Sequence, residues 1–199
     1  MDSFIAYSGT IASVWIIAGI YVASLFYPNY SHSQQFCSEL GAFDSPTQKL
    51  SPVINNYPLG FLFVLFGSYL VATDKAEVAT ISIGIMIIFH GLGTWLCGFF
   101  PMDADPYSET PSTSCEIHSW SGVVMLLSLI IAPAIVVFTN SFPLYLRVFS
   151  LVCIIGCLYF SYKLSLAFKA KRNAGLHQRI SYGFQILWLF VYSIFVASY

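Results

Sequence analysis

Residues 78–103 read VATISIGIMIIFHGLGTWLCGFFPMD and contain no charged side chain before Asp103. An α-helix needs about 20 predominantly apolar residues to cross the hydrocarbon core of a bilayer, and this stretch is long enough. Gly84, Gly91 and Gly98 recur at every seventh position. They therefore lie on one stripe of the helix, where small residues let a neighbouring backbone approach closely. The stretch predicts a central transmembrane helix.

Other stretches of the chain are apolar in the same way. Together they predict six transmembrane helices, at residues 4–27, 58–73, 78–101, 119–138, 143–168 and 180–197. The second is short, and we expect residues before Pro58 to lengthen it. The composition agrees, because 57% of the residues are hydrophobic and only 9% are charged, whereas a soluble domain carries about a quarter charged residues. We predict an all-α fold, a single domain over residues 1–199 built as an integral membrane bundle of six transmembrane helices.

The connections between these helices alternate in length and polarity. Those at 74–77 and 139–142 are tight turns, whereas those at 28–57, 102–118 and 169–179 are longer and polar. In a chain that crosses the membrane six times, the first, third and fifth connections lie on the same side. Six of the nine acidic residues and three of the four histidines fall in these connections. We therefore expect a polar site at this one face of the membrane.

The basic residues favour one orientation of that face. Four of the eight lysines and arginines lie in the fifth connection, and the positive-inside rule then makes the three long connections cytoplasmic, in the cell inner (plasma) membrane. A disulfide between Cys37 and Cys115 would require the opposite placement, because disulfides persist on the oxidising side. Both orientations stay open at this point.

Glu39 is the first of three candidate catalytic residues. It lies beside the apolar residues Phe36, Leu40 and Phe43, which could draw it toward the bundle and favour its protonated form, as a general acid or base requires. The alternative is an exposed carboxylate that caps a short helical turn. Ser38 is a candidate ligand-binding residue, but no strand-turn-helix elbow surrounds it to make it a nucleophile.

Asp103 and His118 are the other two catalytic candidates. Pro101 ends the third helix and delivers Asp103 just beyond the membrane edge, where we expect it to face the bundle. His118 stands at the expected start of the fourth helix and could carry protons. Clusters of Asp, Glu, Cys and His also bind metals, but none of these spacings matches a tight ligand motif. We therefore predict no metal site, and the sequence indicates no particular cofactor.

Three further residues are candidates for binding a ligand. Arg179 offers a forked, permanently charged donor for a phosphate or carboxylate, with His177 nearby; the alternative is an arginine that anchors the helix end among anionic headgroups. His90 lies in the middle of the third helix, where an ionisable group is a functional candidate. A neutral histidine that hydrogen-bonds to a neighbouring helix is the structural alternative.

The order of several short motifs resembles the family of prokaryotic membrane proteins catalogued as domain of unknown function 998 (DUF998). The resemblance covers nearly the whole chain. It is carried by Tyr30-Ser31-His32, Ser38-Glu39-Leu40-Gly41-Ala42, Asn55-Asn56, Gly98-Phe99-Phe100-Pro101-Met102-Asp103, His118 and residues 175–179. The family implies a six-helix bundle and has no established activity. A fainter likeness to eukaryotic six-helix proteins of lipid-anchor remodelling and autophagy would favour lipid as the ligand and a non-cytoplasmic first connection.

These observations leave several functions open. The preferred hypothesis is a lipid-facing site, in an enzyme or a lipid binder, in which Glu39 and Asp103 act as acid/base or headgroup-binding groups and Arg179 holds a phosphate. The second is a transporter or channel for small solutes or ions that uses His90 and the glycine-striped helix. The third is a non-catalytic subunit of a larger membrane complex or an oligomer. Membrane lipids are the expected partners; a net charge of −1 without basic runs argues against nucleic acid.

Overall fold

The computed structural model describes residues 2–73 and 76–198, and all of the regular structure in these residues is helical. Six helices are long and apolar enough to cross a membrane, as predicted. The helices are α1 (Asp2–Ala6), α2 (Ser8–Leu25), α3 (Tyr57–Ala72), α4 (Val78–Phe99), α5 (Thr113–Phe138), α6 (Leu144–Lys169) and α7 (Ala174–Ala197). The first expected helix is interrupted at Tyr7, between α1 and α2.

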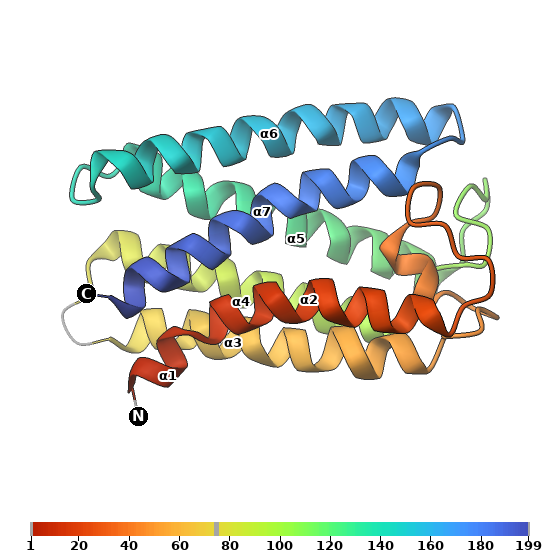
Figure 1. The fold of residues 1–199 in the computed structure, drawn as a ribbon, viewed down its shortest axis with the longest axis horizontal. Coiled ribbons are helices and arrows are strands. Elements are labelled where there is room, and N and C mark those ends of the chain that lie inside the picture. Colours follow the sequence, from red (N-terminus) through yellow and green to blue (C-terminus); the bar gives the residue numbers. More distant parts are fainter. Residues whose placement is uncertain (1, 74–75, 199) are drawn as a thin grey trace.

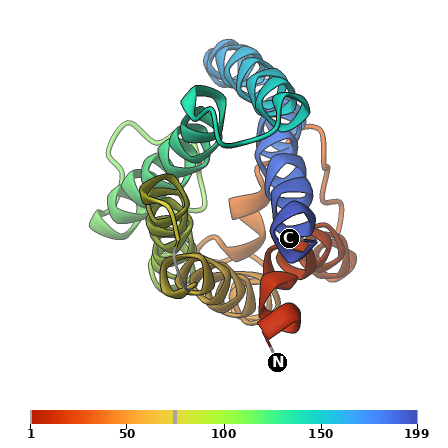
Figure 2. The ribbon, with the colours of Figure 1, turned by 90° about the vertical axis from the view of Figure 1, so that its left-hand side faces the viewer.

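The six long helices form a ring. Each packs against its two neighbours in the order α2, α3, α4, α5, α6, α7, and α7 closes the ring against α2. Figure 2 shows this arrangement along the helix axes. Large buried side chains, among them Phe63, Phe66, Trp188 and Tyr192, fill part of the interior of the ring. Both chain termini lie at one end of the ring (Figure 1).

The glycine stripe of α4 packs against α3 as predicted. A methyl group added to Gly84 would lie 2.7 Å from the carbonyl oxygen of Gly67, and one added to Gly91 would lie 2.9 Å from the carbonyl oxygen of Gly60. Real Cβ atoms essentially never lie this close to another heavy atom to which they are not bonded. The two backbones therefore approach closely because these positions carry no side chain.

The first, third and fifth connections meet at the end of the ring opposite the termini, as predicted (Figure 1). We call this end the loop end. The backbone N–H of Phe43 donates to the Met102 carbonyl at 2.9 Å, which joins the first connection to the third. The N–H of Leu176, in the first turn of α7, donates to the Ser33 carbonyl at 2.9 Å. The expected second connection, 74–77, lies partly outside the described residues.

Two helices begin earlier than the sequence predicts. Helix α5 starts at Thr113 rather than at residue 119, because Ser112 caps it by accepting a hydrogen bond from the Cys115 N–H. Helix α7 starts at Ala174 rather than at residue 180, after Asn173 in the left-handed conformation. Both predicted boundaries were wrong, because hydropathy does not detect polar helical turns. His118 consequently lies within α5, and His177 and Arg179 lie within α7.

The first connection is partly helical. A 3-10 turn, η1 (Cys37–Gly41), covers the loop end, and a π-helical turn, η2 (Pro52–Asn56), runs directly into α3. The resulting apolar span, Pro52–Ala72, confirms that residues before Pro58 lengthen the second helix.

Candidate functional site

The inside of the ring is hollow at the loop end. A cavity of about 760 Å³, which we call the chamber, is lined by one face of each of the six long helices together with η1 and η2. Apolar side chains such as Ile16, Leu59 and Leu126 make up most of its wall. The volume lies within the range of roughly 300–1,000 Å³ that is usual for ligand-binding pockets.

The chamber reaches the outer surface between α5 and α6. These helices are joined by a tight turn near the termini and diverge toward the loop end (Figures 1 and 2). Val123 of α5 and Phe168 of α6 both line the chamber and are 41% and 42% exposed. Ser165 and Lys169 also line it and are exposed. We call this opening the mouth; it lies on the side of the ring that faces lipid in a membrane.

Gly122 leaves open space at the mouth. It lines the chamber, and a methyl group added to it would meet no atom within 4 Å. Gly183 on α7 has equally open surroundings, but it is exposed and does not line the chamber. A larger side chain at Gly122 would therefore obstruct the chamber, whereas one at Gly183 would not.

Uncharged polar groups are set into the inner wall. Thr94 and Gln185 line it with only 4% and 3% of their surfaces exposed. The Gln185 Nε2 donates to the Leu126 carbonyl at 2.9 Å. The Asn55 side chain has one long hydrogen bond, from Nδ2 to the Ser51 hydroxyl at 3.5 Å, and its buried Oδ1 has no partner. This oxygen lies against Gly19 of α2, so the Asn55 side chain has to turn before it can meet a bound molecule. Amide side chains offer both donors and acceptors.

Sequence reasoning missed most of these residues, although one signal was available. Gln185 is the one amide in the apolar stretch 180–197, and polar residues inside transmembrane helices generally face the bundle interior.

Two of the predicted site residues, Ser38 and His118, line the chamber. Ser38 lies in η1, which covers the loop end. His118 lies in the second turn of α5, and its Nδ1 is 2.8 Å from the Phe100 carbonyl oxygen. Because a carbonyl can only accept, Nδ1 carries the proton. This hydrogen bond fixes the orientation of the ring at the chamber wall.

Glu39 does not line the chamber. Its Oε1 accepts a 2.7 Å hydrogen bond from the Phe36 N–H, and its Oε2 accepts one of 3.1 Å from the Gln35 side chain. The carboxylate thus caps η1, as in the alternative that the sequence left open, but it is half-buried rather than exposed.

Asp103 also does not line the chamber, and it is turned toward its own connection rather than toward the bundle as expected. Its two oxygens accept hydrogen bonds from the Ser112 hydroxyl at 2.5 Å and the Ser112 N–H at 2.8 Å. These hydrogen bonds lower the pKa of the Asp103 carboxyl, because they favour its charged form. The expectation was wrong because the helix start at Thr113 brings Ser112 within reach of the carboxylate.

Arg179 is engaged mainly with the first connection, although its buried Nε has no hydrogen-bond partner. Its Nη1 donates to the carbonyls of His32, Gln35 and Gly175, at 2.6, 2.7 and 3.1 Å, and its Nη2 donates to the Tyr30 hydroxyl at 2.6 Å. Burial raises the pKa of the Tyr30 phenol, so the hydroxyl stays protonated. The guanidinium therefore holds neutral oxygens of the protein at the position where the sequence suggested a phosphate.

The remaining two predicted residues lie among helices, where His90 is buried and His177 is half-buried. The Nε2 of His90 lies 2.9 Å from the Tyr182 hydroxyl and its Nδ1 lies 3.1 Å from the Met125 carbonyl, so that it joins α4, α5 and α7. His177 stacks on Phe160 with ring centroids 6.2 Å apart, and its buried Nδ1 has no partner.

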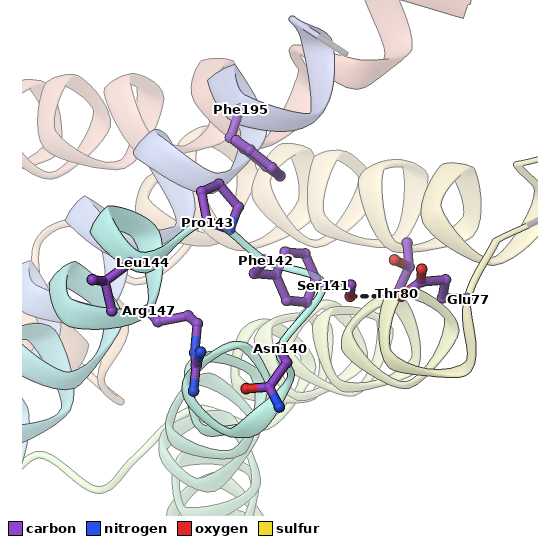
Figure 3. Close-up of a pocket in the computed structure, with 9 residues that line it drawn as sticks. All are labelled: Glu77, Thr80, Asn140, Ser141, Phe142, Pro143, Leu144, Arg147 and Phe195. Carbon is purple, nitrogen blue, oxygen red and sulfur yellow. Dashed lines mark hydrogen bonds between the residues drawn. The ribbon is translucent and has the colours of Figure 1, made fainter.

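A second pocket, of about 680 Å³, lies at the end of the ring where the termini are. Figure 3 shows the Ser141 hydroxyl, which donates to Glu77 at 2.7 Å, and Arg147 on the opposite side of this pocket. The Arg147 Nε donates to the Val137 carbonyl at 2.9 Å. Arg147 was not among the residues predicted for a site.

The cysteines and acids assemble no further site in the described part of the chain. Cys37 and Cys115 are free thiols, so the structure gives no disulfide that would set the orientation. No three His, Cys, Asp or Glu side chains gather as they would around a metal ion within residues 2–73 and 76–198.

Comparison with known proteins identifies the family. The family model described as "Protein of unknown function (DUF998)" matches residues 10–194. No curated protein and no solved structure matches the chain. Because the family match spans nearly the whole sequence, and the fold is the expected six-helix membrane bundle, the chain belongs to the DUF998 family.

Proposed function

We propose that this protein binds a membrane lipid in the chamber and that the lipid enters sideways through the mouth between α5 and α6. The observation that carries the proposal is the position of the mouth. Val123 and Phe168 flank it and are both partly exposed on the lipid-facing side of the ring. A molecule that enters here comes from the bilayer.

The wall of the chamber suits an amphipathic ligand. Ile16, Leu59 and Leu126 offer apolar contact, whereas Asn55 and Gln185 offer hydrogen bonds within the same enclosure. A small polar solute would leave the apolar part of the wall without a partner. A lipid satisfies both, because its chains contact the apolar side chains while its polar part meets the amides.

The predicted polar residues of the loop end take supporting roles in this proposal. Glu39 and Arg179 shape the first connection that covers the chamber, and Asp103 braces the start of α5. Ser38 and His118 remain the predicted residues that would contact the lipid, since both line the chamber.

A pair of glycine variants tests the proposal. Gly122→Phe places a ring in the open space of the chamber, whereas Gly183→Phe places the same ring on the outside of α7. Both changes replace a helical glycine, so they alter helix propensity equally. Each protein is purified in mild detergent, and the lipid that co-purifies with it is quantified by mass spectrometry.

We expect Gly122→Phe to retain severalfold less lipid per protein molecule than the wild type, and Gly183→Phe to retain the wild-type amount. Equal lipid content in all three proteins, with Gly122→Phe still eluting as a monodisperse species, would overturn the proposal.

We further propose that the loop end faces the cytoplasm in the cell inner (plasma) membrane. The exposed residues Lys169, Lys171 and Arg172 support this orientation. In intact cells, a single-cysteine variant that keeps only Cys115 should resist a membrane-impermeant maleimide and should react after the cells are broken. Labelling in intact cells would reverse the orientation.

A further inference from the structure

We infer that the chamber takes a lipid with an uncharged head group that carries a hydroxyl or amide N–H, such as a diacylglycerol or a long-chain alcohol, in preference to a phospholipid. This inference rests on the proposed function and names the chemical class of its ligand.

The charge of the lining carries the inference. The polar side chains that line the chamber are amides, hydroxyls, thiols and one imidazole; Lys169 is the one lysine or arginine among the described lining residues, and no Asp or Glu is among them. Lys169 is exposed and belongs to the last turn of α6, at the mouth. A phosphate inside the chamber would therefore lose its hydration without gaining a permanent cation, which is costly in a medium of low polarity.

Arg179 does not supply that cation. It lies close to the loop end, but all of its hydrogen-bond acceptors are neutral oxygens of Tyr30, His32, Gln35 and Gly175. Its buried Nε has no hydrogen-bond partner, but Arg179 does not line the chamber. To turn its guanidinium toward a phosphate there, it would have to release these carbonyls.

The inner wall instead fits a group that both donates and accepts. The Asn55 amide makes only one long contact, 3.5 Å from Nδ2 to Ser51, and its unpartnered Oδ1 is buried against Gly19 of α2. A ligand therefore displaces only this weak contact, and the side chain turns to present its oxygen. A hydroxyl or an amide N–H can donate to a side-chain amide oxygen, and a hydroxyl can also accept from its nitrogen. A fully ionised phosphate offers acceptors but no donor.

A competition experiment tests the inference on the full chain in detergent. The probe is dioleoylglycerol with a photoreactive diazirine in one chain, and the competitors are dioleoylglycerol, its methyl ether, a prenyl alcohol and dioleoylphosphatidic acid. We expect dioleoylglycerol or the prenyl alcohol to compete at about tenfold lower concentration than phosphatidic acid. The alcohol that competes better shows whether a glyceride or a prenyl alcohol supplies the hydroxyl.

The methyl ether isolates the donor, because it keeps the oxygen and loses the O–H. We expect the wild type to prefer the alcohol about fivefold over the ether, and Asn55→Leu to lose that preference while it still binds both. If Asn55→Leu does not fold, Gln185→Leu serves the same purpose on α7, and Gly183→Phe is the control for both.

The outcomes separate this inference from the proposed function. Phosphatidic acid could compete as well as or better than the alcohols, with Lys169→Gln weakening its competition. The head group would then stay at the mouth, and the inference would be wrong while lipid binding stands. If no competitor displaces the probe, and cross-linking is unchanged in Gly122→Phe, lipid binding in the chamber itself is wrong.

Discussion

The Nη2 of Arg179 donates a 2.6 Å hydrogen bond to the hydroxyl of Tyr30, 149 residues earlier in the chain. Its Nη1 adds bonds to the carbonyls of His32 and Gln35 in the same connection. One guanidinium thus fastens the first connection to the start of α7. Because this connection continues into η1 above the chamber, the cation stabilises the cover of the candidate site without contacting what lies beneath it.

Replacing Arg179 should loosen that cover. Arg179→Ala leaves carbonyl oxygens without donors, and we expect it to lower the free energy of unfolding by about 2 kcal/mol. Local loosening should also expose Lys49, the one trypsin cleavage residue in the connection 28–57. Limited proteolysis in detergent measures this as faster cleavage after Lys49. Arg172→Ala, at an exposed residue of the preceding turn, is the control. Unchanged cleavage in Arg179→Ala would mean that other contacts hold the connection.

Asp103 should make the stability of the third connection depend on pH. The Ser112 hydrogen bonds hold its pKa below its ordinary value of 3.8 in the folded protein. A carboxyl with a depressed folded pKa stabilises the protein above its unfolded pKa, and that contribution disappears as the pH falls through the folded pKa. We therefore expect wild type to melt at a higher temperature than Asp103→Asn at neutral pH, with the gap closing below a pH of about 4.

The matched control for Asp103 is Glu109→Gln, which removes an exposed acid from the same connection. It should melt like the wild type across the whole pH range. A gap between wild type and Asp103→Asn that persists unchanged at pH 3 would show that the amide disrupts the connection for a reason unrelated to charge.

The fold could be predicted from hydropathy because each membrane crossing needs a long apolar stretch. Alternate connections then lie on the same side of the membrane, which places the three long connections together. The packing of α4 could be predicted as well, because Gly84 and Gly91 leave room for one nearby backbone. Both predictions use properties that are local in the sequence.

The site could be predicted only in part, because hydrogen-bond partners are not local. Glu39 and Asp103 are conspicuous as acids, yet each has a backbone N–H as a near neighbour and serves as a capping or bracing group. The chamber arises from the divergence of α5 and α6, which no single residue encodes. Asn55 and Gln185 acquire significance only once the ring has placed them around the same space.

His90 should contribute stability through its hydrogen bond to Tyr182. Replacing one of the two side chains leaves the polar group of the other buried without this hydrogen bond, whereas replacing both leaves neither group unpaired. We expect His90→Phe and Tyr182→Phe each to lower the melting temperature in detergent, and the double variant to lose less than the sum of the two. The coupling energy should be about 1 kcal/mol. Strict additivity would indicate that the 2.9 Å contact contributes nothing to stability.

The same variants of His90 and Tyr182 also test the transport hypothesis. If His90 served as part of a solute path, the variants would change uptake into proteoliposomes at temperatures where they remain folded. We expect no uptake above that of protein-free liposomes for wild type or variants, because both ring nitrogens already have protein partners.

Cys37 should report on the chamber through its reactivity. Its thiol lines the chamber, and burial raises its pKa above the ordinary value of 9.0, so little of the reactive thiolate forms at pH 8. In single-cysteine proteins, we expect maleimide to modify Cys37 more slowly than Cys115 at pH 8. The Cys37 rate should keep rising as the pH passes 9.0, because the fraction of thiolate is still increasing there. Added dioleoylglycerol should slow Cys37 further and leave Cys115 unaffected, since Cys115 does not line the chamber. Rapid labelling of Cys37 at pH 8, insensitive to lipid, would mean that η1 opens freely to water and does not cover a lipid site.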